Sequence, residues 1–226
     1  MKRQVILLHG ALGASVQLNP LAERLITENF QVFTFSFSGH GKEAFQEEFG
    51  IEQFSRELQQ FISLNNLSSP DVFGYSMGGY VALYTAAKNP GLIGRITTLG
   101  TKFKWDKETA AKEIKNLDPV LIEQKVPKFA IRLKEMHGEN WIQLLNRTAE
   151  MMIRMGEKSP LSDKDLSSIQ NKVSIGLADQ DKMVSVEETD RVATLIKNSS
   201  RFTLFNTAHP IETADPSILV KQLLLD

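Results

Sequence analysis

The chain has 226 residues, of which 42% are hydrophobic, and its formal net charge is −1. The length and apolar content predict one globular domain over residues 1–226 with a substantial core. The near-neutral charge argues against nucleic-acid and anionic-membrane partners, which favour strongly basic proteins. The chain has no cysteine, which excludes disulfides and thiolate catalysis.

The N-terminal apolar run is short. It covers residues 5–8 and ends at His9 and Gly10, so it lacks the length of a signal-peptide core. No apolar stretch approaches the roughly 20 residues that span a bilayer. We therefore expect a cytoplasmic protein, a monomer by default, that acts on a small molecule.

Short apolar runs alternate with amphipathic helices along most of the chain. Alternation of strand and helix is typical of βαβ units, which predicts an α/β fold with a parallel sheet of about six strands. The predicted strands cover residues 5–8, 32–35, 72–73, 96–99, 173–175 and 202–205. The helices between and after them are marked by Leu18, Leu21, Ala22, Leu25 and Ile26, by Phe54, Leu58, Phe61 and Ile62, by Ala82, Leu83, Ala86 and Ala87, and by residues 187–197 and 217–225.

Residues 102–168 interrupt this alternation. The segment contains no convincing strand, and it is too long for a plain loop. We expect a helical cap insertion before the next strand. Its apolar residues form the core of the cap helices, and some of them line a pocket: Phe103, Trp105, Leu117, Phe129, Leu133, Trp141, Leu144, Leu145, Met151 and Met152.

A G-x-S-x-G pentapeptide covers residues 74–78, with Ser76 at its centre. It lies where the 72–73 strand should turn into a helix. A strained strand-turn-helix elbow exposes a serine hydroxyl for nucleophilic attack, and the flanking glycines allow the backbone to pack closely. The pattern is weak by itself, so its interpretation depends on a base, an orienting acid and an oxyanion site elsewhere.

His209 is the candidate base, because it directly follows the last predicted strand. The carboxyl ends of parallel strands form the ligand-binding edge of such a sheet. The orienting acid should follow the 173–175 strand, where Asp179 and Asp181 are both available. We favour Asp181, which is followed by an apolar anchor at Val184, and expect the other aspartate to be a turn or capping residue.

An oxyanion site needs two backbone amides that point at one place. Met77 follows the nucleophile at the start of a helix whose dipole favours negative charge. Ala11 follows the His9-Gly10 pair in the loop after the first strand, and we assign the second amide to it. His9 itself is expected to brace this loop by hydrogen bonding.

With these motifs the chain resembles the α/β-hydrolase superfamily. The matching residues are His9-Gly10, Gly39-His40-Gly41, Gly74-Tyr75-Ser76-Met77-Gly78-Gly79, Asp181-Lys182-Met183-Val184 and Ala208-His209-Pro210, in family order over nearly the whole chain. The resemblance implies a mostly parallel sheet flanked by helices, a catalytic Ser76–Asp181–His209 triad, a variable cap, and no cofactor or metal. Two features depart from the family: Ser36 stands where many members have an acidic residue, and the N-terminal antiparallel strands are missing.

Three functions are compatible with these residues. The leading hypothesis is a carboxylesterase-like serine hydrolase of a small ester or related acyl substrate. The second is an elimination of the menaquinone-pathway synthase type, which uses the same triad and needs pocket arginines such as Arg132, Arg147 and Arg154. The third is a non-catalytic binding protein on the same fold.

Overall fold

The computed structural model describes residues 2–224 of the chain. Six strands form one sheet in the order β2-β1-β3-β4-β5-β6, and every neighbouring pair in it is parallel. The strands are β1 (Gln4–Leu8), β2 (Gln31–Thr34), β3 (Asp71–Tyr75), β4 (Ile96–Leu99), β5 (Val173–Ala178) and β6 (Ser199–Leu204). The predicted fold class and strand number are confirmed.

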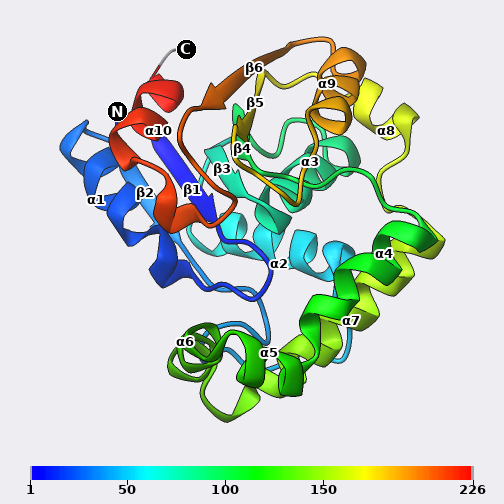
Figure 1. The fold of residues 1–226 in the computed structure, drawn as a ribbon. Coiled ribbons are helices and arrows are strands. Elements are labelled where there is room, and N and C mark those ends of the chain that lie inside the picture. Colours follow the sequence, from blue (N-terminus) through cyan, green and yellow to red (C-terminus); the bar gives the residue numbers. More distant parts are fainter. Residues whose placement is uncertain (1, 225–226) are drawn as a thin grey trace.

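Helices cover both faces of the sheet (Figure 1). On one face, α1 (Asn19–Thr27) packs beside α10 (Pro216–Leu224) over an apolar cluster that contains Val5, Leu7 and Phe73. On the other face, the helices are α2 (Ile51–Leu64), α3 (Met77–Lys88) and α9 (Val186–Leu195). Because both faces are covered, β1 and β3 are buried almost throughout, which explains their continuous apolar runs.

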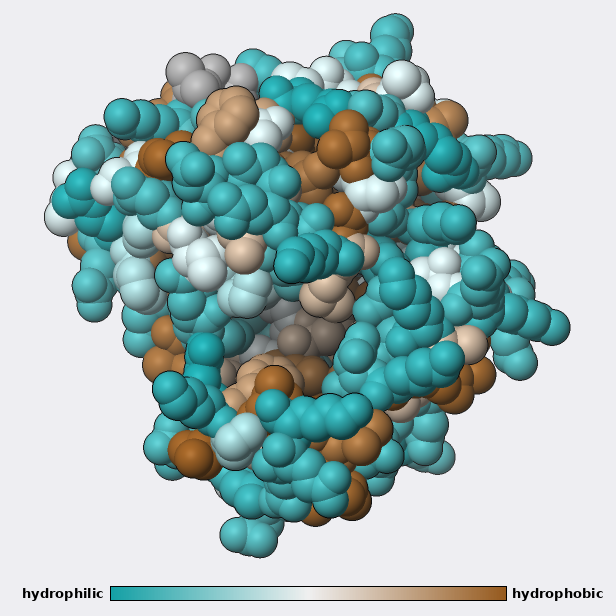
Figure 2. Space-filling view, viewed as in Figure 1, coloured by the Kyte–Doolittle hydropathy of each residue, from teal (hydrophilic) through white to brown (hydrophobic). Residues whose placement is uncertain are grey.

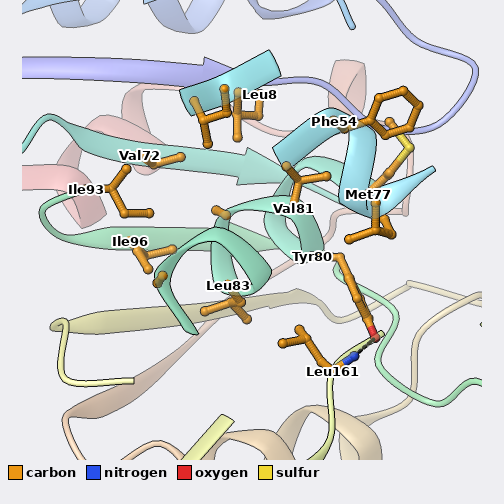
Figure 3. Close-up of a cluster of buried hydrophobic side chains, with 14 of the residues drawn as sticks. Leu8, Phe54, Val72, Met77, Tyr80, Val81, Leu83, Ile93, Ile96 and Leu161 are labelled. Atoms are coloured by element: carbon orange, nitrogen blue, oxygen red, sulfur yellow. Dashed lines mark hydrogen bonds between the residues drawn. The ribbon is translucent and has the colours of Figure 1, made fainter. Parts of the chain in front are cut away.

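A larger apolar cluster, the main core, lies on this second face of the sheet, and Figure 3 shows it in close-up. Val81 and Leu83 of α3 pack near Val72 and Ile96 of the sheet. Tyr80 is buried, and its hydroxyl group accepts a hydrogen bond from the Leu161 amide at 3.2 Å. The residues that follow Ser76 are therefore part of the main core, and this fixes the position of the elbow.

The segment between β4 and β5 is helical. It contains α4 (Lys107–Glu113), α5 (Pro119–Lys125), α6 (Pro127–His137), α7 (Trp141–Glu157) and α8 (Asp163–Ser168). Helices α4 and α7 lie side by side, and α5 and α6 extend below them in Figure 1. We call α4–α7 the helical insertion.

Element ends differ from the predictions where apolar residues are exposed. Strand β6 begins three residues earlier than predicted, at Ser199, and Phe205 lies beyond it with 72% of its surface exposed. Ile26 is 56% exposed although it follows the apolar spacing of α1. At both positions the apolar sequence pattern extends beyond the part of the element that a neighbouring helix or strand covers, so the side chain is exposed. The predicted end of the last helix at Leu225 lies outside the described residues.

None of the helices within residues 2–224 has both the length and the apolarity that crossing a membrane requires.

The elbow depends on close backbone contacts at its glycines. A Cβ atom at Gly78 would meet the carbonyl oxygens of Leu8 and His9, and one at Gly74 would meet the backbone of Gly79. Backbone atoms cannot move aside as a flexible side chain can. The N-terminus of α3 can therefore approach β1 only because residue 78 has no side chain.

We predict that Gly78→Ala lowers the free energy of unfolding by about 3 kcal/mol, because overpacking a rigid contact forces the backbone to shift. Gly91→Ala is the control, since a Cβ atom there meets nothing within 4 Å. It should cost only about 1 kcal/mol, for its positive φ. Urea unfolding measures both, and equal losses would contradict the proposed contact.

Candidate active site

Ser76 occupies a strained position between β3 and α3. Its φ of 50° and ψ of −115° lie outside the usual regions for a residue with a side chain. The surrounding structure holds it there: its amide donates to Leu99 O at 2.8 Å, and its carbonyl accepts from the Thr101 hydroxyl at 3.0 Å. Ser76 is half-buried, whereas all its neighbours in residues 71–80 are buried. The strain therefore presents one hydroxyl group at the surface of the core.

His209 and Asp181 form a hydrogen-bonded pair. They follow β6 and β5, and His209 Nδ1 lies 2.6 Å from Asp181 Oδ2. The other carboxylate oxygen of Asp181 accepts from the amides of Met183 and Val184 at 2.8 and 3.0 Å. Each oxygen therefore has a partner, and the carboxylate is fixed in the direction of the ring.

The second candidate acid has a different role. Asp179 accepts a hydrogen bond from the Thr207 amide at 3.1 Å and so ties the β5 loop to the β6 loop. The structure pairs His209 with Asp181, and Asp179 fits the alternative expectation of a turn residue.

The electrostatics of Asp181 favour its ionised form. Burial alone would raise its pKa, but the hydrogen bond and charge of His209, with the amides of Met183 and Val184, keep that pKa below its usual value. The carboxylate can therefore hold Nδ1–H of the ring, which leaves Nε2 free to accept a proton.

Two further contacts place the His209 loop. The Tyr75 hydroxyl donates to His209 O at 3.0 Å, so the residue before the serine holds the loop that carries the histidine. Gly100, with a φ of 61°, lies against the Asp181–His209 pair, where a Cβ atom would come within 3.4 Å of the ring. The sequence pattern contains no signal for either contact.

The two predicted oxyanion amides lie at the same cavity as Ser76. Met77 is the first residue of α3, and first-turn amides have no acceptor within their own helix. Ala11 lies in a tight turn closed by a hydrogen bond from Gly13 N to Gly10 O at 3.1 Å. In the part of the chain that the structure describes, the Ala11 amide donates to no other residue.

His9 braces this turn, as predicted. Its ring is fully buried, Nδ1 lies 2.8 Å from Gly10 O, and Nε2 accepts from the Phe37 amide at 3.1 Å. Burial lowers the pKa of His9 to about 4, which keeps the ring neutral. Ser36, at the position where the family often has an acid, accepts from the Ser15 amide at 3.0 Å and fixes the loop after the turn.

A cavity of about 400 Å³ lies over Ser76 and His209, between the sheet and the helical insertion. Figure 2 shows the surface hollowed in this region, with apolar side chains inside the hollow and hydrophilic ones around it. Of the apolar residues that we expected in the insertion, five reach the cavity: Trp105, Leu117, Phe129, Met151 and Met152. Leu133, Trp141 and Leu145 pack within the insertion instead.

The three arginines considered for the pocket have separate positions. Arg132 lines the cavity and forms an ion pair with Glu212. Arg147 and Arg154 lie outside the cavity, where they donate to the carbonyls of Glu47 and Phe49 at 2.6 Å. These two side chains hold the loop before α2, so they are not available to a ligand at Ser76.

Some cavity residues could not be identified from the sequence. Lys102 and Glu113 form an ion pair of 3.3 Å on the wall, and Met155 and Met183 contribute apolar surface. They belong to no motif, and only the packing of the insertion on the sheet brings them together. Within residues 2–224, no group of three or more His, Asp and Glu side chains is placed to hold a metal ion.

Comparison with known proteins agrees with this architecture. Residues 4–168 match the family model described as alpha/beta hydrolase fold. A thermophilic esterase from Thermogutta terrifontis superposes with a TM-score of 0.79 at 17% identity, covering 99% of this chain and 89% of that one.

Two curated proteins are similar over a shorter segment. Ethanol acetyltransferase 1 of Hanseniaspora uvarum is 26% identical over 94 residues, which are 41% of this chain and 28% of that protein. The 2-succinyl-6-hydroxy-2,4-cyclohexadiene-1-carboxylate synthase of Yersinia pestis (strain Pestoides F) is 29% identical over 98 residues, 42% of this chain and 35% of that protein. The match thus spans about a third or less of the length of these relatives.

We predict that His209→Gln raises the pKa of Asp181, because the opposing charge is lost while the burial remains. Carboxyl-carbon NMR during an acid titration measures this shift. Asp179 is the internal control: its pKa is lowered by the amides of Thr207 and Asn206 and should stay where it is. An unchanged Asp181 midpoint would contradict the assigned pair.

Proposed function

The chain belongs to the alpha/beta hydrolase fold family, and on that basis we propose that it is a serine hydrolase that cleaves a small carboxylic ester or related acyl substrate. The observation that carries the proposal is the His209–Asp181 hydrogen bond of 2.6 Å at a cavity that Ser76 also lines. A strained serine and an oriented imidazole that line one cavity are parts that nucleophilic acyl transfer needs.

In the proposed reaction, Ser76 Oγ attacks the carbonyl carbon of the ester while His209 Nε2 takes the hydroxyl proton. Asp181 holds Nδ1–H and stabilises the imidazolium. The amides of Ala11 and Met77 stabilise the tetrahedral oxyanion. His209 then gives its proton to the leaving alkoxide, and a water molecule, activated by the same ring, hydrolyses the acyl-enzyme.

The helical insertion acts in this proposal as a cap on a single domain of residues 1–226. Residues 102–168, the predicted cap that contains α4–α7, supply one wall of the cavity, and Ser76 and His209 lie on the sheet side. A wall of this kind limits the access of water to the oxyanion, which strengthens the electrostatic stabilisation there.

The charges of the cavity favour a neutral substrate. Its two cationic side chains each have an anionic partner, Arg132 with Glu212 and Lys102 with Glu113. A substrate with several carboxylates would have to displace these partners. The elimination chemistry of a carboxylate synthase therefore has less support here than the hydrolysis of an ester.

We predict that Ser76→Ala reduces the hydrolysis of p-nitrophenyl acetate to the background rate, because the attacking oxygen is lost. A fluorophosphonate probe should label the wild-type protein at Ser76. Absence of both labelling and hydrolysis would favour a binding protein, and labelling with turnover only of the synthase substrate would favour elimination.

The two aspartates provide a matched pair for the same assay. Asp181→Asn should lower kcat by about 10³–10⁴, because the imidazole loses its orientation and its charge partner. Asp179→Asn should stay within about twofold of wild type, since Asp179 contacts a backbone amide and not the ring. The reverse order would contradict the assigned acid.

A further inference from the structure

The methionines of the chain are concentrated at the cavity. Five of the seven line it: Met77, Met151, Met152, Met155 and Met183. They come from α3, α7 and the loop after Asp181, so no single helical periodicity explains the set. Methionine is unbranched and polarizable, and it adapts to apolar ligands of different shape.

The methionine wall is supported from behind. Met151 and Met155 belong to the main core cluster, and Met152 belongs to the cluster inside the insertion. Their helix α7 is thus held on two sides while its methionines face the cavity. Packing on both sides therefore supports the wall from behind.

From this wall and the paired charges we infer that the acyl part of the substrate is a flexible, unbranched aliphatic chain that lies against Met151, Met152 and Met155. This inference rests on the proposed ester hydrolysis and adds its substrate class. An acyl chain attached to Ser76 would extend toward the insertion, where the lining is apolar. Burial of each added methylene then contributes to binding in the transition state.

The test is a series of p-nitrophenyl esters from acetyl to myristoyl. We expect kcat/KM to rise by about fourfold for each buried methylene and to level off when the cavity is filled. A series that is flat, or that falls from acetyl onward, would overturn the inference while Ser76 labelling by a fluorophosphonate upholds the hydrolase. Loss of labelling as well would instead overturn the proposed function.

A matched pair of variants locates the chain. Met152→Phe fills part of the cavity and should move the best substrate to a shorter ester than in the wild type. Met136→Phe is the control, because Met136 does not line the cavity. Identical chain-length profiles for both variants would place the chain elsewhere and refute the assignment.

A second inference rests on a different observation, the position of His137 at the end of α6. Its side chain is buried and connects three segments. Nδ1 accepts from the Gly41 amide at 2.9 Å, and Nε2 lies 3.0 Å from Leu12 O. Since Nδ1 is an acceptor, the proton is on Nε2 and is donated to Leu12. Burial lowers the pKa of His137, in keeping with this neutral ring.

Leu12 is the residue after Ala11 in the tight turn, and it has a strained φ of 58°. His9 holds the carbonyl of Gly10 on the other side of Ala11. A peptide group is planar, so the direction of the Gly10 carbonyl also sets the direction of the Ala11 amide. The turn that carries the proposed oxyanion donor is therefore fixed by two rings, and one of them belongs to the helical insertion.

We propose that His137 is a positioning residue, which aligns the Ala11 amide by holding Leu12 O from the insertion. Docking of the insertion and formation of the oxyanion site are then coupled through one hydrogen bond. The proposal depends on the assigned oxyanion amide, and the Ser76→Ala assay tests the hydrolase independently of it.

Two amide variants separate the functions of the ring nitrogens. In His137→Gln, the side-chain NH₂ group can reach Leu12 O and donate to it. We therefore expect kcat to stay within about threefold of the wild-type value. In His137→Asn, the side chain can accept from the Gly41 amide but is too short to reach Leu12 O. This variant should lose about tenfold or more in kcat, while KM stays within about twofold of the wild-type value.

Thermal unfolding of both variants provides the structural control. If the two variants lost the same amount of kcat and the same amount of melting temperature, the positioning role would be overturned, because both substitutions would then act only through stability. A loss in His137→Asn that appears in KM alone would also overturn it, because misalignment of an oxyanion donor weakens the transition state more than the bound substrate.

Discussion

The structure depends on the close approach of the N-terminus of α3 to β1 and β3. This approach is possible because Gly74 and Gly78 have no side chains where backbone atoms meet. It forces Ser76 into a strained conformation and places its hydroxyl group at the edge of a rigid core. Tyr80 and Val81 anchor the following turns in that core, so the strain is compensated by burial rather than relieved by movement.

Parallel strand order then brings the other groups to this point. The loops after β1, β3, β5 and β6 all leave the same edge of the sheet, because parallel strands share one carboxyl edge. Ala11, Ser76, Asp181 and His209 come from these four loops. Contacts between the loops fix their relative positions, as in the hydrogen bond from the Tyr75 hydroxyl to the His209 carbonyl.

The helical insertion supplies apolar and charged side chains that line the cavity at this edge of the sheet. It supplies a methionine wall, the Glu113 partner of Lys102, and Arg132, whose partner Glu212 lies after β6. Through His137 it also contacts the turn beside Ala11. In the proposed function, the same segment would therefore affect both substrate choice and the geometry of the oxyanion site.

The sequence by itself determined the fold and predicted the candidate site residues, because both depend on local signals. Alternating apolar runs predicted the six strands, and the pentapeptide with the His9, Asp181 and His209 loops predicted what gathers at the sheet edge. The choice between Asp179 and Asp181 needed the tertiary structure, since both lie within three residues of β5 and only one faces the ring. The character of the cavity, the ion pair of Arg132 with Glu212, and the contact of His137 with Leu12 were also decided there. They join residues far apart in the chain, and no local pattern encodes which faces of two helices will meet.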